Sequence, residues 1–336
     1  MRAFLPGVPL ATLLGLLYAS APAAQPSSSV SLDVVVADAT GHPALGLGAA
    51  DFEITEDGRP VQVQTCSPVD AANDSSGART YILVVDGFHL SPRGAERVQP
   101  LLEQFAADAV AAGDRVSVAW LGSSPRISRL TTDSQTLRQM IAAASSSARN
   151  IQLAKGSPVA GPLEFGARPD GAATTFALLT SAVNRVVQVD GRRAAVVFVS
   201  EGVAGADSES RRTADAERAF LTTAARHFVN VYPIDPLGMS SINSGLATPD
   251  ESQPAGLAQW NSLRALAANT GGRATLGRTD LTSAYRQIAQ DNSSYYLLSY
   301  ASPHANERDG DFHEVRVRVK RAGAKVTTRK GWYEPK

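Results

Sequence analysis

The stretch YILVVDGFHL, residues 81–90, decides the fold. A continuous apolar run leads into Asp86, and the chain then turns through Gly87, Phe88 and His89. An unbroken apolar run of this length is typical of a parallel strand that is buried on both faces of a sheet. In open α/β sheets, ligands bind at the carboxyl ends of such strands. We therefore expect Asp86 to lie at the functional edge of a parallel sheet.

From Thr80 onward, strand-like and helix-like patterns alternate. The runs RVSVAWL (115–121) and FVNVYPID (228–235) indicate buried strands, and TTFALLTSAVNRVVQ (174–188) has the apolar spacing of a helix. Such alternation predicts a parallel sheet that is wrapped by helices. We therefore assign residues 80–293 to a doubly wound, mostly parallel α/β domain of the Rossmann-like kind.

One segment of this domain breaks the alternation. A helix is predicted over 134–144, but residues 145–173 are rich in Ser, Gly and Pro. Loops of that length inside a compact domain are typically functional or mobile. We therefore expect a long loop over 145–173.

The two ends of the chain have the patterns of β-structure. Segment 28–70 contains alternating runs such as VSLDVVVAD with turn residues between them, and a polar linker, 71–79, follows it. Segment 294–336 contains the alternating run FHEVRVRVKR (312–321). Each piece alone has too few strands, because isolated hairpins are marginal in water. We therefore predict that the two segments pair into one small β-domain.

The first 24 residues have the pattern of a signal peptide. Arg2 precedes the short apolar run VPLATLLGLLYA, and Ala21 and Ala23 stand at cleavage-like spacing. The run is shorter than the roughly 20 residues of a spanning helix, although an uncleaved anchor is the alternative. We expect segment 1–24 to be removed. The mature protein would then have no transmembrane span and would be secreted, periplasmic or part of the cell envelope.

Charge composition argues against nucleic acid as a partner. The 336 residues include 32 Lys and Arg and 32 Asp and Glu, so the formal net charge is zero. Nucleic acids and anionic membranes bind basic surfaces. The single cysteine, Cys66, cannot form an internal disulfide and is expected to act as a small hydrophobic residue.

Both end segments carry a family resemblance. The stretches VVVADATGHPALGLGAADFEITEDGRPVQV (34–63) and FHEVRVRVKRAGAKVTTRKGWY (312–333) are similar to the opening and closing parts of secreted bacterial proteins described as von Willebrand factor A-related. The resemblance implies a von Willebrand A-like domain over 80–293. Such domains usually bind proteins or other ligands, often through a divalent cation. The resemblance therefore implies a binding function rather than an enzymatic one.

The same resemblance implies where a cation would be bound. The usual metal-ion-dependent adhesion site (MIDAS) uses an Asp-x-Ser-x-Ser loop after the first strand, a later Thr, and an Asp after the fourth strand. Here Asp86 and Thr174 match, Glu201 stands in place of the last Asp, and Phe88 and Leu90 occupy the serine positions. Phe and Leu supply no oxygen ligand, whereas hard cations need about six. We expect a degenerate MIDAS and no cofactor; if Mg²⁺ or Ca²⁺ binds, its protein ligands are Asp86, Thr174 and Glu201.

Histidines allow two other interpretations. His89 could join Asp86 and Glu201 in a transition-metal site, since two carboxylates and an imidazole are an acceptable ligand set. Its spacing matches no known metal signature, so a polar loop residue is the simpler interpretation. The stretch HANERDGDFH (304–313) contains turn chemistry between two strands, so a hairpin loop is predicted there.

No sequence signature supports catalysis. The chain lacks G-x-S-x-G, a P-loop, H-E-x-x-H and a G-x-G-x-x-G after a strand. Ser200, in VSEG after a strand, has no histidine placed as its base and is interpreted as a loop residue. We therefore expect a non-catalytic protein that binds a protein partner. A divergent metal-dependent or hydrolytic enzyme and a structural component of the envelope are the alternatives.

The candidate binding surface is the set of loops at the carboxyl ends of the strands, where the strand order is expected to reverse. Its residues are Asp86, Gly87, Phe88, His89, Thr174, Thr175, Glu201 and Gly202. The structural alternative is that Asp86 hydrogen-bonds a neighbouring loop while Phe88 packs inward.

Overall fold

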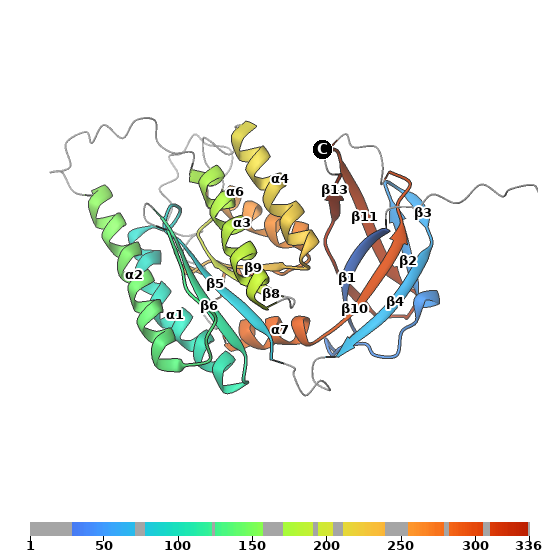
Figure 1. The fold of residues 1–336 in the computed structure, drawn as a ribbon, viewed down its shortest axis with the longest axis horizontal. Coiled ribbons are helices and arrows are strands. Elements are labelled where there is room, and N and C mark those ends of the chain that lie inside the picture. The colour runs from blue at the N-terminus through green and yellow to red at the C-terminus, as the bar shows by residue number, and fades with distance from the viewer. Residues whose placement is uncertain are drawn as a thin grey trace, which may run out of the picture.

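The computed structural model divides the chain into an α/β half and an all-β half (Figure 1). The residues it describes are 29–70, 78–122, 125–156, 171–190, 194–203, 211–238, 255–278, 282–304 and 310–334. The predicted signal peptide, 1–24, and most of the predicted linker lie outside these ranges.

The α/β half is built on a five-stranded sheet with the order β7-β6-β5-β8-β9. Its strands are β5 (Thr80–Asp86), β6 (Arg115–Leu121), β7 (Arg126–Ile127), β8 (Ala194–Val199) and β9 (Asn230–Ile234). β5 runs parallel to β6 and β8, β8 runs parallel to β9, and only the two-residue edge strand β7 is antiparallel. The predicted mixed α/β class with a mostly parallel sheet is confirmed.

Helices cover both faces of this sheet (Figure 1). They are α1 (Pro92–Ala111), α2 (Ser134–Gly156), α3 (Gly171–Asp190), α4 (Arg211–Arg226), α6 (Ala255–Thr270) and α7 (Thr282–Ser293). Side chains along a strand point alternately to opposite faces. Accordingly, Tyr81, Leu83 and Val85 join a core with α1, α2 and α7, whereas Ile82 and Val84 join a second core with α3, α4 and α6. Two separate hydrophobic cores therefore hold β5 in place.

The predicted loop over 145–173 is wrong at both ends, because α2 continues to Gly156 and α3 begins at Gly171. Leu137, Ile141, Ala144 and Ala148 are all buried, and their spacing of four, three and four residues places them on one face of a helix. Alanine is also the best helix former, so the Ala-rich composition favours continuation of the helix. The stretch 157–170 lies outside the described residues.

Strands from both ends of the chain form the all-β half. They are β1 (Ser29–Ala37), β2 (Phe52–Glu56), β3 (Arg59–Val61), β4 (Val63–Asp70), β10 (Ser294–Ala301), β11 (Phe312–Val319), β12 (Lys325–Thr327) and β13 (Gly331–Tyr333), with a short 3-10 turn at Ala49–Asp51. Two antiparallel sheets result, with the orders β12-β1-β10-β4 and β13-β11-β2-β3. β10 lies between β1 and β4, and β2 pairs with β11. Each sheet therefore contains strands from both ends of the chain.

Buried polar side chains connect the two halves. Arg329, which is 5% exposed, donates from its guanidinium to the carbonyl oxygens of Ser31 in β1 and Ala225 in α4. Asn230 in β9 donates to the Asp33 carboxylate at 3.0 Å. These contacts bring the start of the β-domain against α4 and β9.

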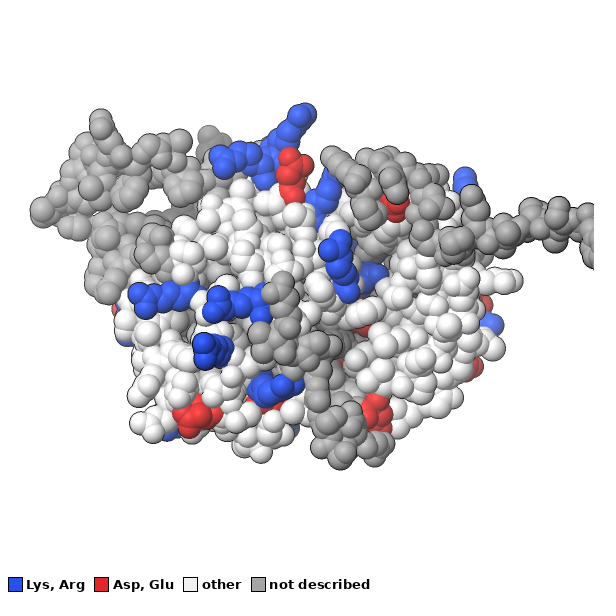
Figure 2. Space-filling view, in the orientation of Figure 1, with Lys and Arg blue, Asp and Glu red and all other residues white. Residues whose placement is uncertain are grey.

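Charged side chains are unevenly spread over the face of the molecule in Figure 2. On the face shown in Figure 2, basic side chains lie in separate groups over the helical half, and most of the visible β-half is uncharged. Among the described residues, no helix combines the length and the apolar character that crossing a membrane requires.

Removing the Arg329 guanidinium tests the connection between the halves. We expect Arg329→Met to lower the free energy of unfolding by about 2–4 kcal/mol, because the carbonyls of Ser31 and Ala225 lose a charged donor that is itself buried. The control is Arg316→Met in β11, since Arg316 is largely exposed and pairs with an exposed Glu314. It should change stability by no more than about 0.5 kcal/mol. Urea unfolding of both variants measures the two changes in stability. Equal losses of stability in the two variants would contradict the role of Arg329 in connecting the halves.

Candidate functional site

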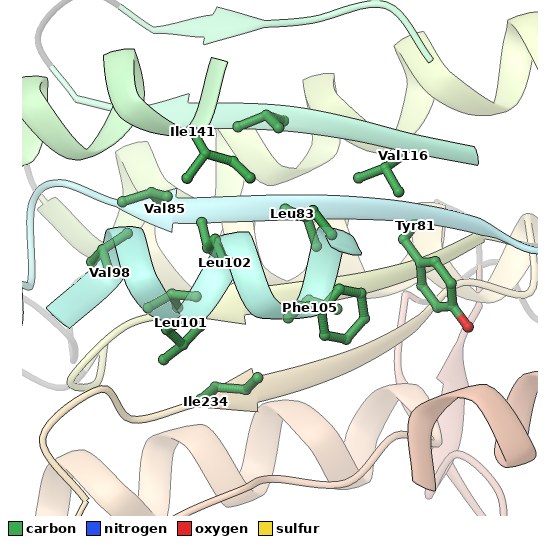
Figure 3. Packing of buried hydrophobic residues seen from close by; sticks show 14 of the residues in the cluster. Tyr81, Leu83, Val85, Val98, Leu101, Leu102, Phe105, Val116, Ile141 and Ile234 are labelled. Carbon is green, nitrogen blue, oxygen red and sulfur yellow. The ribbon is translucent and has the colours of Figure 1, made fainter. Parts of the chain in front are cut away.

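Strand β5 places Asp86 at the carboxyl edge of the central sheet. All seven residues of β5 are buried, and β6 and β8 flank it in parallel register. Figure 3 shows Leu83 and Val85 of β5 lying against Val98 and Leu102 of α1. Since the chain leaves β5 toward β6 on one side and reaches β8 on the other, the strand order reverses beside Asp86. This is the position at which α/β sheets form a crevice.

The turn after Asp86 requires glycine. A Cβ atom on Gly87 would lie 2.0 Å from the Trp120 ring, and the Gly87 amide donates to the carbonyl of Leu121 at 2.7 Å. Trp120 is itself buried, so its ring has little room to move. Gly87 therefore lets the loop follow β6 closely.

The Asp86 carboxylate is fully buried and accepts four hydrogen bonds from its own chain. Its Oδ1 accepts from the Phe88 amide at 3.1 Å and from the Thr175 hydroxyl at 3.4 Å. Its Oδ2 accepts from the Ser200 hydroxyl and from His89 Nδ1, both at 2.8 Å. A carboxylate can only accept, so His89 carries its proton on Nδ1. With about two acceptor positions on each oxygen, these donors fill the carboxylate.

Thr175, rather than Thr174, supplies the hydroxyl that reaches Asp86. Thr175 is buried near the start of α3, whereas Thr174 is half-buried. The sequence alone does not distinguish the two adjacent threonines. Which of them faces inward depends on how the helix packs against the sheet.

Glu201 caps a helix. Its Oε1 accepts hydrogen bonds from the amide and the hydroxyl of Ser91, at 2.8 and 2.7 Å. Ser91 is the N-cap of α1, and its hydroxyl also accepts from the Gly94 amide. A negative charge is favourable near a helix N-terminus. A Cβ on Gly94 would lie 1.9 Å from Glu201 Oε1, so glycine makes room for this contact.

The two residues at the lost serine positions have different environments. Leu90 is 3% exposed and belongs to the core beneath α1, whereas Phe88 is half-buried in the loop. Gly202 is buried, and a Cβ there would lie 2.6 Å from Gln259 in α6. Only Phe88 of these three therefore offers a side chain to the outside.

A third carboxylate at this edge was missed in the sequence. Asp235 follows β9 directly, as Asp86 follows β5, and it is 1% exposed. It accepts from the Leu237 amide at 2.9 Å and from the Trp260 indole at 2.7 Å. The run VYPID carried the same signal as YILVVD, namely an apolar strand that ends in Asp.

These acidic groups do not converge as metal ligands. Within the described ranges, Asp86, His89 and Glu201 do not form a group whose ligand atoms all lie within 4.8 Å of one another. Ser200 and His89 both contact the Asp86 carboxylate, and Ser200 is fully buried.

Comparisons with known proteins add little to this geometry. No family model matches the chain, and no curated protein matches it. The chain is similar to the solved structure titled "Crystal Structure of the TFIIH p34 N-terminal Domain", at 12% sequence identity over 64% of this chain and 96% of that one. The TM-score is 0.33, so this likeness carries no argument about function.

Replacing Glu201 should change how stability depends on pH. Burial raises the pKa of Glu201 above its ordinary value of 4.5; hydrogen bonds from Ser91 oppose the rise, and Asp235 and Asp86 add to it. The folded state then binds the proton more tightly than the unfolded state. The contribution of Glu201 is full below about pH 4.5 and is lost as the pH rises through the folded pKa. Glu201→Gln keeps an acceptor for Ser91 and removes this dependence.

Urea unfolding between pH 4 and 8 makes the measurement. We expect the stability of the parent, relative to Glu201→Gln, to fall as the pH rises above 4.5. A difference that instead grows with pH would mean that the pKa of Glu201 is lowered.

Proposed function

We propose that the chain is a secreted, non-catalytic interaction protein with a von Willebrand A-like, doubly wound domain. It binds a protein partner through the loops at the carboxyl edge of the central sheet, without tightly bound Mg²⁺ or Ca²⁺. The observation that carries this proposal is the Asp86 carboxylate, whose two oxygens already accept four hydrogen bonds from the protein.

A hard cation at Asp86 would have to displace protein donors. Mg²⁺ and Ca²⁺ need about six or more oxygen ligands. Phe88 and Leu90 supply no side-chain oxygen, and Leu90 is buried in the core. Glu201 is held by Ser91 at the N-terminus of α1. Hydrogen bonds therefore take the place that a cation would have in a complete MIDAS.

The geometry of Ser200 argues against nucleophilic catalysis at this edge. An active serine needs a base within hydrogen-bond reach and access to substrate. The Ser200 hydroxyl is fully buried and donates to Asp86, and His89 directs its Nδ1 to the same carboxylate oxygen. Serine and histidine therefore share an acceptor here and do not form a nucleophile–base pair.

A protein partner fits the surface better than a nucleic acid does. The chain has equal numbers of basic and acidic residues, and the basic groups in Figure 2 are separated. Phe88 presents a half-buried aromatic ring in a loop that hydrogen bonds hold in place. Aromatic side chains of this kind frequently anchor protein interfaces. Secretion is supported by the signal-like pattern of residues 1–24.

Thermal unfolding in the presence of divalent ions tests the absence of a tight cation. We expect no rise in Tm when millimolar Mg²⁺ or Ca²⁺ is added to chelator-treated protein. An ion present at 100 times its Kd would add about 2.7 kcal/mol of stability, which is readily detected. The matched variant is Asp86→Asn, which has nearly the same shape and removes the charge. A rise in Tm in the parent that Asp86→Asn abolishes would contradict the proposal.

Affinity capture tests the binding surface. Immobilised protein is exposed to extracts of the cells that produce it, with and without a chelator. We expect a protein to be retained in both conditions, and Phe88→Ala to weaken its binding at least tenfold, as loss of an anchor residue does. The control is Phe312→Ala, because Phe312 is 41% exposed but lies in the β-half. Equal retention by the two variants, or retention that requires a divalent ion, would contradict the proposal.

A further inference from the structure

A second polar cluster lies in the β-domain and has no part in the proposed binding surface. Glu56 ends β2, His304 follows β10, and His313 is in β11. One ligand atom from each of these three side chains lies within 4.8 Å of the other two. Residues from both ends of the chain are therefore brought together, although only the two histidines are close in sequence.

Glu56 is a buried carboxylate whose hydrogen-bond donors, among the described residues, are neutral. It is 0% exposed and accepts hydrogen bonds from Tyr300, Ser302 and Trp332, which are all neutral donors. Among the described residues, no Lys or Arg forms an ion pair with Glu56. Burial of an uncompensated charge is costly, so positive charge beside Glu56 would be strongly favoured. Within the described ranges, its Oε1 accepts from Ser302 alone, at 2.5 Å, which leaves that oxygen a further acceptor position.

His313 presents an unused ring nitrogen at the same place. The residue is 5% exposed, and its Nδ1 lies 2.9 Å from Asp57 Oδ2. The carboxylate can only accept, so Nδ1 carries the proton and Nε2 presents a lone pair. Over the described part of the chain, Nε2 is buried and has no hydrogen-bond partner. Buried polar atoms are normally satisfied, so this one needs an explanation.

The second histidine stacks on the first. The rings of His304 and His313 are 4.5 Å apart and inclined by 13°, and His304 Nε2 is 3.6 Å from Asp57 Oδ2. The Trp332 ring lies 4.9 Å from that of His313. A carboxylate that orients a histidine whose other nitrogen binds an ion is the usual arrangement at metal centres. Asp57 has this relation to His313.

We propose that Glu56, His304 and His313 bind a divalent transition-metal ion of the Zn²⁺ class, with Asp57 as the residue that positions His313. Two imidazoles and a carboxylate suit such an ion and leave a fourth position to water. In a tetrahedral zinc site the ligand atoms lie about 3.4 Å apart, and each imidazole nitrogen binds the ion in the plane of its own ring. Because the two rings are stacked, binding requires the His304 ring to turn out of the stack as well as to approach Glu56. His304 can provide that movement, because its side chain is 19% exposed and follows the end of a strand. The ion would offset the charges of Glu56 and Asp57.

This site is independent of the proposed function, and metal titration tests it directly. The chelator-treated chain is titrated with Zn²⁺ in a calorimeter and with Co²⁺ by visible absorption. We expect one ion per chain, with cobalt bands typical of a four-coordinate nitrogen and oxygen site. Glu56→Gln, His304→Ala and His313→Ala should each weaken Zn²⁺ binding at least tenfold. Asp57→Asn should weaken it roughly 10- to 100-fold, as loss of an orienting carboxylate does.

The remaining histidines outside the proposed binding surface provide the controls. His42→Ala and His227→Ala should bind Zn²⁺ as the parent does, since both residues lie outside the cluster. If His313→Ala fails to fold, the partly exposed His304 decides the question. Parent-like Zn²⁺ affinity in His304→Ala would overturn the proposal, as would loss of binding in either control. The proposal would also be overturned if the parent fails to bind one Zn²⁺ per chain when the Zn²⁺ concentration is about 100 μM.

Discussion

Burial of the Asp86 carboxylate is the constraint on which the carboxyl edge of the central sheet depends. A charge with no exposure to water must be satisfied by donors from the protein. Those donors come from three separate segments: the loop after β5 gives Phe88 and His89, the start of α3 gives Thr175, and the end of β8 gives Ser200. One side chain therefore determines how close these segments lie. A partner that binds this surface would contact loops whose spacing is fixed by these hydrogen bonds.

The other two carboxylates at this edge act in the same way. Glu201 connects the end of β8 to the N-terminus of α1, and Asp235 connects the end of β9 to the Trp260 indole in α6. In a metal-binding domain, acidic groups at these strand ends would converge on an ion. Here each one holds a different neighbour, so the acidic composition of the edge is explained by the packing of helices and loops around it.

Local patterns predicted the central sheet but not the contacts between distant segments. The apolar run before Asp86 was enough to place β5, because few other structures bury seven consecutive residues. The lost serine positions could be counted in sequence, yet the burial of Leu90 depends on α1 packing over the sheet. The contact between Ser91 and Glu201 joins residues that are 110 positions apart, and the meeting of Glu56 with His313 depends on pairing between the chain ends. The extension of α2 was missed because the serines at 145–147 interrupt the apolar stripe that runs from Leu137 through Ala144 to Ala148.

The construction of the β-domain from both ends of the chain has a consequence for its synthesis. Ser29 pairs with Ala301, and Phe52 pairs with Val319. Contacts between residues so distant in sequence form slowly, because the entropy cost of closing a long loop comes before the contacts can stabilise the fold. During synthesis, β1 and β4 have no strand partner until β10 has been made. The α/β half, whose strands and helices follow one another, can assemble during that interval and bring the two ends together.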